Sequence, residues 1–187
     1  MTELKDYSGE FKRDLKWEDF SKEALVQALK ATSRCVTGLD GFWYSLVKER
    51  FGEKVAGELD AELWKKMTWF ELTQIQKALN IHGDDIATMC KFLQNSPDSI
   101  GVLHWDCDIK NRNLAIGTVT HCRALEYMER HGDYALMKTA CEAVDAALIP
   151  QVGRWINPKI KVTCLKLPPR KSKDEACCQW EIKLQED

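Results

Sequence analysis

The spacing of apolar residues changes near residue 97, and this change restricts the fold of the chain more than any other feature. Before it, apolar side chains recur at intervals of three and four residues, which is the period of a helix packed on one side. After it, apolar and polar residues partly alternate, which is typical of strands. Helices gathered in one half of a chain and strands in the other indicate an α+β domain.

We therefore expect a single α+β domain over residues 21–187, preceded by a flexible lead-in over residues 1–20. Residues 21–97 would form a helical layer. Residues 98–187 would form an antiparallel sheet with a packed helix, and would carry a cysteine-rich site. The full chain of 187 residues is long enough for one core of ordinary size.

The helical layer is predicted to be a long antiparallel hairpin followed by a short helix. The first long helix ends at Phe51-Gly52, because glycine commonly ends helices, and it has a weak point near Gly38. The second ends near residue 80, and Asp84 or Asp85 caps the short third helix. Three tryptophans of this layer are expected to lie away from the cysteine site: Trp43, Trp64 and Trp69.

The second half of the chain is predicted to contain two pairs of strands separated by a helix. The expected elements are a hairpin over 102–109 and 114–120, a helix from Asp133 to Pro150 and Gly153, and strands over 160–167 and 177–184. Because side chains alternate along a strand, Cys178 should face the core and Cys177 should face away from it.

The composition excludes several classes of partner and compartment. With 27 basic and 29 acidic residues, the net charge of -2 gives no field that would attract nucleic acid. No apolar run approaches the roughly 20 residues that cross a membrane, and residues 1–16 lack the apolar core of a signal peptide. We therefore expect a cytoplasmic protein, in which the eight cysteines serve metal binding, thiol chemistry or packing rather than disulfides.

Cysteines from separate elements are the strongest functional signal. Cys122 follows the second strand, Cys141 lies on the buried face of the helix, and Cys178 lies in the last strand, so the three thiols can converge as zinc ligands. His121 is a weaker candidate for the fourth ligand, and Cys164 on the neighbouring strand competes with it. The alternative is that each cysteine is core packing, which is how we interpret two others, Cys35 and Cys90.

Several of these motifs together carry a resemblance to known families. The stretches that carry it are residues 7–11, Asp40-Gly-Phe-Trp-Tyr44, Val119-Thr-His-Cys122, Asn157-Pro-Lys-Ile-Lys-Val-Thr-Cys164, Pro168-Pro169 and Cys178-Gln-Trp-Glu181. They resemble a family of small cytosolic proteins of anaerobic bacteria and archaea that is grouped with L-2-amino-thiazoline-4-carboxylic acid hydrolases. The chain is also similar to the four-vinyl-reductase-type small-molecule-binding domains.

The resemblance implies an α+β ligand-binding fold shared with heme nitric-oxide sensors and Golgi transport subunits. It also implies a zinc site at Cys122, Cys141, Cys164 and Cys178. Leu167 departs from the pattern, because members often have a further cysteine directly before the double proline.

We expect a zinc-binding module that binds a small ligand or a partner, with a mainly structural metal. One alternative is a metal-assisted hydrolase of a cyclic amidine or amide, with Glu142 or Glu181 as the general base. Another is a thiol redox protein that uses Cys177-Cys178. A homodimer through the helical layer is a further expectation.

Overall fold

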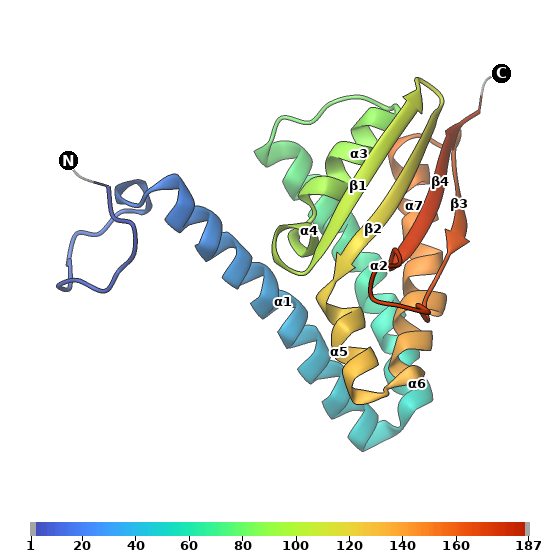
Figure 1. Cartoon of the computed structure of the whole chain (residues 1–187), viewed down its shortest axis with the longest axis horizontal. Coiled ribbons are helices and arrows are strands. Elements are labelled where there is room, and N and C mark those ends of the chain that lie inside the picture. The colour runs from blue at the N-terminus through green and yellow to red at the C-terminus, as the bar shows by residue number, and fades with distance from the viewer. Residues whose placement is uncertain (1–2, 186–187) are drawn as a thin grey trace.

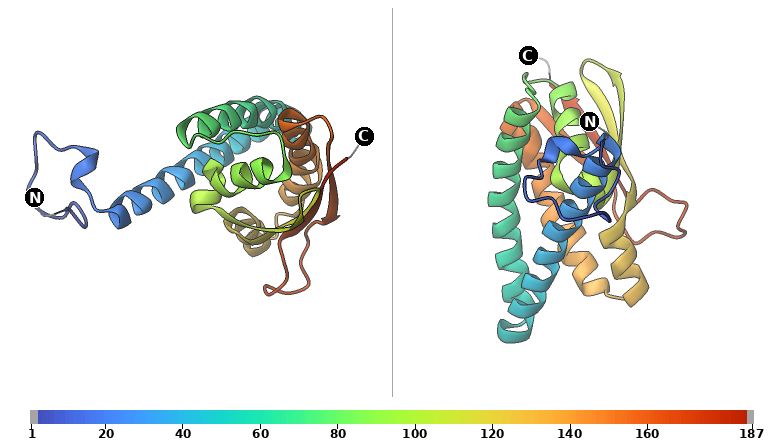
Figure 2. Two further views of the ribbon diagram at one scale, coloured as in Figure 1. Left: turned by 90° about the horizontal axis from the view of Figure 1, so that it is seen from above. Right: turned by 90° about the vertical axis from the view of Figure 1, so that its left-hand side faces the viewer.

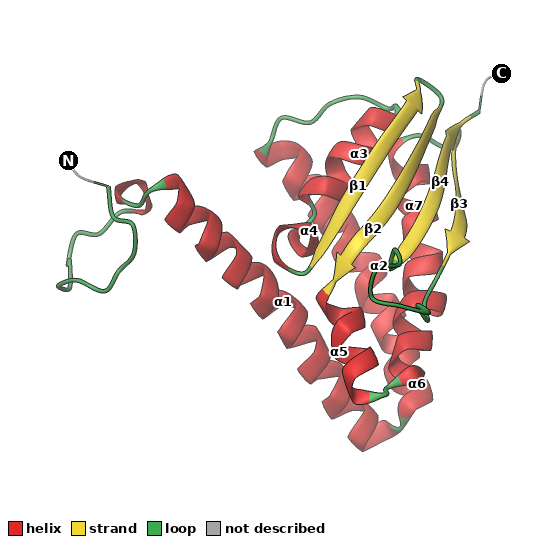
Figure 3. Cartoon of the chain, viewed as in Figure 1, coloured by secondary structure: helices red, strands yellow, loops and turns green. Residues whose placement is uncertain are grey.

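The computed structural model describes residues 3–185 and has the predicted α+β architecture, with a helical layer packed on one antiparallel sheet (Figures 1 and 3). The elements in chain order are a 3-10 turn (Trp17–Asp19), α1 (Lys22–Phe51), α2 (Glu53–Ala78), α3 (Ile86–Asn95), α4 (Pro97–Gly101), β1 (Leu103–Asn111), β2 (Leu114–Cys122), α5 (Arg123–His131), α6 (Tyr134–Met137), a π-helical segment (Lys138–Asp145), α7 (Ala146–Ile156), β3 (Ile160–Lys166) and β4 (Cys178–Leu184).

The four strands form a sheet of order β1-β2-β4-β3, in which all neighbours are antiparallel. The face that carries Trp105, Val119 and Trp180 is buried against the helices, and α3 and α7 both contact strands. Figure 2 shows the helices gathered on one side of the sheet. The polar residues of the alternating pattern lie on the other face, which explains why these strands alternate instead of being apolar throughout.

The long helical hairpin is present, and the predicted weak point near Gly38 is absent because α1 continues through it without a break. Ser21 caps α1 by accepting a hydrogen bond from the amide of Ala24, and Gly52, at φ 86°, reverses the chain into α2. The N-terminal half of α1 projects from the body and carries the loop of residues 3–20 (Figures 1 and 2). That loop is closed where Leu4 pairs with Phe20.

Two glycines set the distance between layers. A Cβ on Gly101 would lie 2.5 Å from the carbonyl oxygen of Lys30, so α4 reaches α1 only because this residue has no side chain. A Cβ on Gly153 would lie 2.8 Å from Ile160 Cγ2, which brings α7 close against β3. Pro150 and Gly153 do not end the helix as predicted: α7 passes through both to Ile156, because Gly153 lets the helix pack against β3 and the chain becomes extended only at Asn157.

Among the described residues, no helix combines the length and the apolar character that crossing a bilayer requires. The interpretation of Cys90 as a core residue is confirmed, since it is buried in α3. The same interpretation of Cys35 is wrong: it is exposed, because Ser33 and Thr37 face α4 and Cys35, midway between them, lies on the other side of α1.

Candidate functional site

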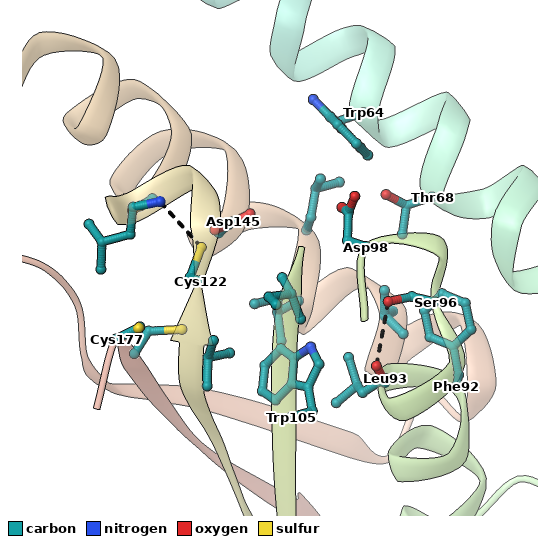
Figure 4. A pocket seen from close by; sticks show the side chains of 18 of the residues that line it. Trp64, Thr68, Phe92, Leu93, Ser96, Asp98, Trp105, Cys122, Asp145 and Cys177 are labelled. Atoms are coloured by element: carbon teal, nitrogen blue, oxygen red, sulfur yellow. Dashed lines mark hydrogen bonds between the residues drawn. The ribbon is translucent and has the colours of Figure 1, made fainter. Parts of the chain in front are cut away.

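A cavity of about 150 Å³ lies between the helical layer and the buried face of the sheet. Its wall is formed by α2, α3, α4, the ends of β1 and β2 nearest the helices, the π-helical segment, α7 and the residues around the start of β4. A cavity of this volume can hold a molecule the size of benzene. Figure 4 shows the side chains that point into it.

The ionisable side chains of the wall are all acidic. They comprise four thiols and three carboxyls: Cys122, Cys141, Cys177, Cys178, Glu71, Asp98 and Asp145. Of the described residues that line the cavity, none is Lys, Arg or His. The remainder is mostly apolar and includes Phe92, Trp64 and Trp105. The cavity therefore favours positive charge and apolar groups over anions.

The thiols gather at one end, where three chain segments meet. Cys122 ends β2 and caps α5, and its Sγ accepts a hydrogen bond from the amide of Leu125 at 3.4 Å. Cys178 begins β4, and the indole Nε1 of Trp180 donates to its Sγ at 3.3 Å. Cys141 comes from the π-helical segment. π-Helices are rare in proteins, and those that occur often lie at functional sites.

Burial keeps these thiols protonated. Burial first, with a contribution from the negative charge of Asp145, raises the pKa of Cys122 and of Cys178 to about 12. The pKa of Cys141 is raised by the same two causes in the same order. Burial likewise raises the pKa of Asp145 to about 7. Without a cation the thiols are neutral at physiological pH and poor nucleophiles.

Three of the predicted site residues, Cys122, Cys141 and Cys178, line the same cavity, and the other two do not. The ring of His121 is half exposed and its Nδ1 lies 3.2 Å from Glu126 Oε1, because the strand continues through His121 and turns its side chain outward. Cys164 lies toward the far edge of the sheet on β3, where its thiol donates to the carbonyl of Lys166 at 3.6 Å.

The two proposed general bases of the hydrolase hypothesis also lie elsewhere. Glu142 is exposed on the outer side of the π-helical segment. Glu181 lies on the outer face of β4, where its Oε1 pairs with Lys183 Nζ at 2.8 Å. Neither carboxyl lines the cavity, so the structure offers no support for either as a base acting there.

Cys177, named only for the redox alternative and not as a zinc ligand, was expected to face away from the core. It is buried and lines the cavity, because β4 begins one residue later and strand alternation does not apply to it. Arg170 Nη1 approaches the Cys177 Sγ at 3.7 Å from behind the wall, and its Nη2 pairs with Glu129 Oε2 at 2.6 Å. The basic side chain that contacts Cys177 is thus already paired with Glu129.

The part of the cavity that carries the carboxyls of Glu71 and Asp98, called the carboxyl end of the cavity below, was missed as well. Glu71 and Thr68 come from α2, and Asp98 comes from α4, so no short motif joins them. Asp145 was detectable, since it follows Cys141 by one helical turn and shares its face. Trp64, expected to lie in a separate layer, lines this cavity together with the thiols, because α2 crosses directly over the cavity.

Within residues 3–185, no group of three or more His, Cys, Asp or Glu side chains is arranged to hold a metal ion. The donor set nonetheless suits zinc in kind, because cysteine thiolates are preferred zinc ligands. A closed site would require the side chains of the four cavity cysteines to rotate toward one another.

The model of DUF6125, a family of unknown function, matches residues 18–184. No curated protein and no solved structure matches the chain.

Proposed function

We propose that this protein, which belongs to the DUF6125 family of unknown function, binds a small ligand in the cavity between its layers, and that the thiol end holds a zinc ion. The supporting observation is that Cys122, Cys141, Cys177 and Cys178 line one cavity whose described wall has no basic side chain. Four thiols and Asp145 share one buried place, and Arg170, which contacts the Cys177 Sγ, is already paired with Glu129. A divalent cation would supply that compensation and lower the pKa of each thiol it binds.

The first prediction concerns zinc content. We expect the protein, reduced and then dialysed against zinc, to retain about one zinc ion per chain, as a four-cysteine site does. Cys122→Ser and Cys141→Ala should lose most of it, since each removes one ligand. Elemental analysis measures the metal, and alkylation of the folded protein measures which thiols it protects.

Cys164→Ser is the matched control, because this cysteine is also partly buried in the sheet but lies outside the cavity. It should keep its zinc, and so should Cys35→Ser on the exposed side of α1. Zinc well below one equivalent in the unmodified protein, with all cavity thiols freely alkylated in the folded state, would rule out the metal part of the proposal.

We also propose that the helical hairpin pairs with a second copy. Apolar side chains remain exposed along both helices of the hairpin: Val26, Leu29, Leu39, Phe42, Leu46, Val55, Leu59 and Leu63. Spacings of three and four place many of them in rows, and the hairpin surface of one copy can pair with the same surface of another about a two-fold axis. Exposed apolar patches of this kind mark protein interfaces.

The second prediction tests this pairing. Phe42→Glu, at a side chain that is 74% exposed, should convert a dimer to a monomer without lowering the melting temperature of the monomer. Ile109→Glu, at an exposed apolar residue of the β1–β2 hairpin, should leave the dimer intact. Sedimentation at several concentrations measures the mass. A monomeric unmodified protein at high micromolar concentration would refute the pairing.

A further inference from the structure

Glu71 is a buried acidic residue of α2. Glu71 is 6% exposed, and its Oε1 has no hydrogen-bond partner within the described part of the chain. Glu71 lines the cavity, one helical turn from Thr68 on α2, and the labelled Thr68 lies away from Cys122 and Cys177 in Figure 4. A buried polar atom without a partner costs free energy, roughly as much as a lost hydrogen bond, so such an atom in a cavity wall marks a place where a ligand donor fits.

The surroundings of Glu71 determine what kind of donor fits. Asp98 enters the same end of the cavity from α4, and Figure 4 shows its carboxyl near Thr68 and Trp64, away from Cys122 and Cys177. Thr68 stands one turn before Glu71 on the same face of α2. Two carboxyls and a hydroxyl form a set of acceptors, and an ammonium group has three donors to offer them.

The rest of this end is aromatic and apolar. Trp64 and Phe92 line it, and Trp105 forms the floor on the sheet side. Aromatic faces attract cations and also accommodate flat hydrocarbon groups. With a cavity of about 150 Å³, the remainder of the ligand is limited to about the size of a benzene ring.

We propose that the carboxyl end of the cavity binds the ammonium group of a small primary amine whose body is a single ring or a short hydrocarbon chain. Glu71 accepts one donor of the ammonium on Oε1, Asp98 accepts a second, and the hydrocarbon body lies among Trp64, Phe92 and Trp105. Carboxylate and phosphate ligands are disfavoured, because the described wall of the cavity offers them no basic side chain. This assignment specifies the small ligand of the function proposed above, and it requires no metal at the thiol end.

Binding of the amine is coupled to the proton on Glu71. Burial, and then the charge of Asp98, raise the pKa of Glu71 to about 8. Asp98 in turn has a raised pKa through burial, although the Thr37 hydroxyl donates to its Oδ1 at 2.8 Å, and Asp40 of α1 adds negative charge. Glu71 is therefore mostly protonated at pH 7 in the free protein. The ammonium ion favours the ionised carboxyl, so its binding releases a proton and strengthens as the pH rises toward 8.

Calorimetric titration with three ligands of the same shape tests the assignment: benzylamine, benzyl alcohol and benzoate. We expect benzylamine to bind at millimolar concentration or below, benzyl alcohol to bind about tenfold or more weakly, and benzoate not to bind, because only the ammonium makes charge-assisted hydrogen bonds to the carboxyls. Cyclohexylamine and butylamine extend the test to amines with other hydrocarbon groups of similar size. In buffers of different ionisation enthalpy, the heat at pH 7 should reveal proton release.

Glu71→Gln should weaken benzylamine binding by about tenfold or more and abolish the proton release, while benzyl alcohol binding stays unchanged. Glu62→Gln is the matched control, because it lies on the same helix, its carboxyl is exposed, and it pairs with Lys66 outside the cavity. Asp98→Asn provides a second variant at the site. Thermal unfolding of each variant verifies that it is folded.

The assignment is overturned if none of the three amines binds at millimolar concentration, if benzyl alcohol binds as well as benzylamine, or if folded Glu71→Gln binds benzylamine like the unmodified protein. Its failure is distinguishable from failure of the zinc site. Cys122→Ser should lose zinc and keep amine binding, whereas Glu71→Gln should lose amine binding and keep zinc.

Discussion

Glu71→Gln is expected to stabilise the protein by roughly 3 kcal/mol or more at pH 8 and to leave its stability nearly unchanged at pH 4.5. Glu71 is a buried residue of α2 whose pKa is raised from 4.5 to about 8, first by burial and then by the charge of Asp98. Glutamine keeps the shape of the protonated acid, and it cannot ionise.

The sign follows from where the proton is held. Below pH 4.5, Glu71 is protonated in both the folded and the unfolded chain, so it has no effect on the pH dependence. Between 4.5 and about 8, the unfolded chain loses this proton while the folded protein keeps it, and the free energy of unfolding falls as the pH rises. The variant lacks this loss, so the difference between the two proteins grows with pH.

Urea denaturation at several pH values measures this difference. Asp60 and Asp145 also have pKa values raised to about 7, so the unmodified protein loses stability toward alkaline pH for more than one reason. Subtracting the curve of the variant isolates Glu71. Glu62→Gln should show no such divergence, because its carboxyl is exposed and its pKa is lowered by Lys66. Parallel curves for Glu71→Gln and the unmodified protein would show that Glu71 is ionised in the folded state.

Trp180→Ala is expected to cost about 3–5 kcal/mol of unfolding free energy, the usual range for removing a large buried aromatic side chain. Trp180 is fully buried in β4, between Gly117 of β2 and Cys164 of β3. It also donates to the Sγ of Cys178, so its loss removes the group that orients that thiol toward the cavity.

Trp180→Phe separates the two effects. It retains most of the ring and should lose much less stability, but it removes the hydrogen bond to Cys178, so this thiol should become easier to alkylate in the folded protein. Trp17→Ala, at a tryptophan of the N-terminal loop that is 67% exposed, should change stability by no more than about 0.5 kcal/mol. Equal losses for Trp180→Ala and Trp17→Ala would contradict the described core.

Local sequence patterns determined the class and order of the elements. Helical spacing before residue 97 and alternation after it predicted the hairpin and the sheet, and Ser21, Asp85 and Asp133 cap helices in the structure. Such features depend on neighbours within a few residues, so they can be identified in one sequence. The same reasoning put Cys122, Cys141 and Cys178 at the ends or inner faces of elements that pack together.

Only the tertiary structure decided which side chains share the cavity. Glu71 and Asp98 belong to different helices and carry no motif, and Trp64 lines the cavity only because α2 crosses it. Because β4 starts at Cys178, the side chain of Cys177 faces the cavity. Because β2 continues through His121, the side chain of His121 faces outward. These outcomes depend on crossing positions and strand ends, which are set by packing between distant segments rather than by the local period of the sequence.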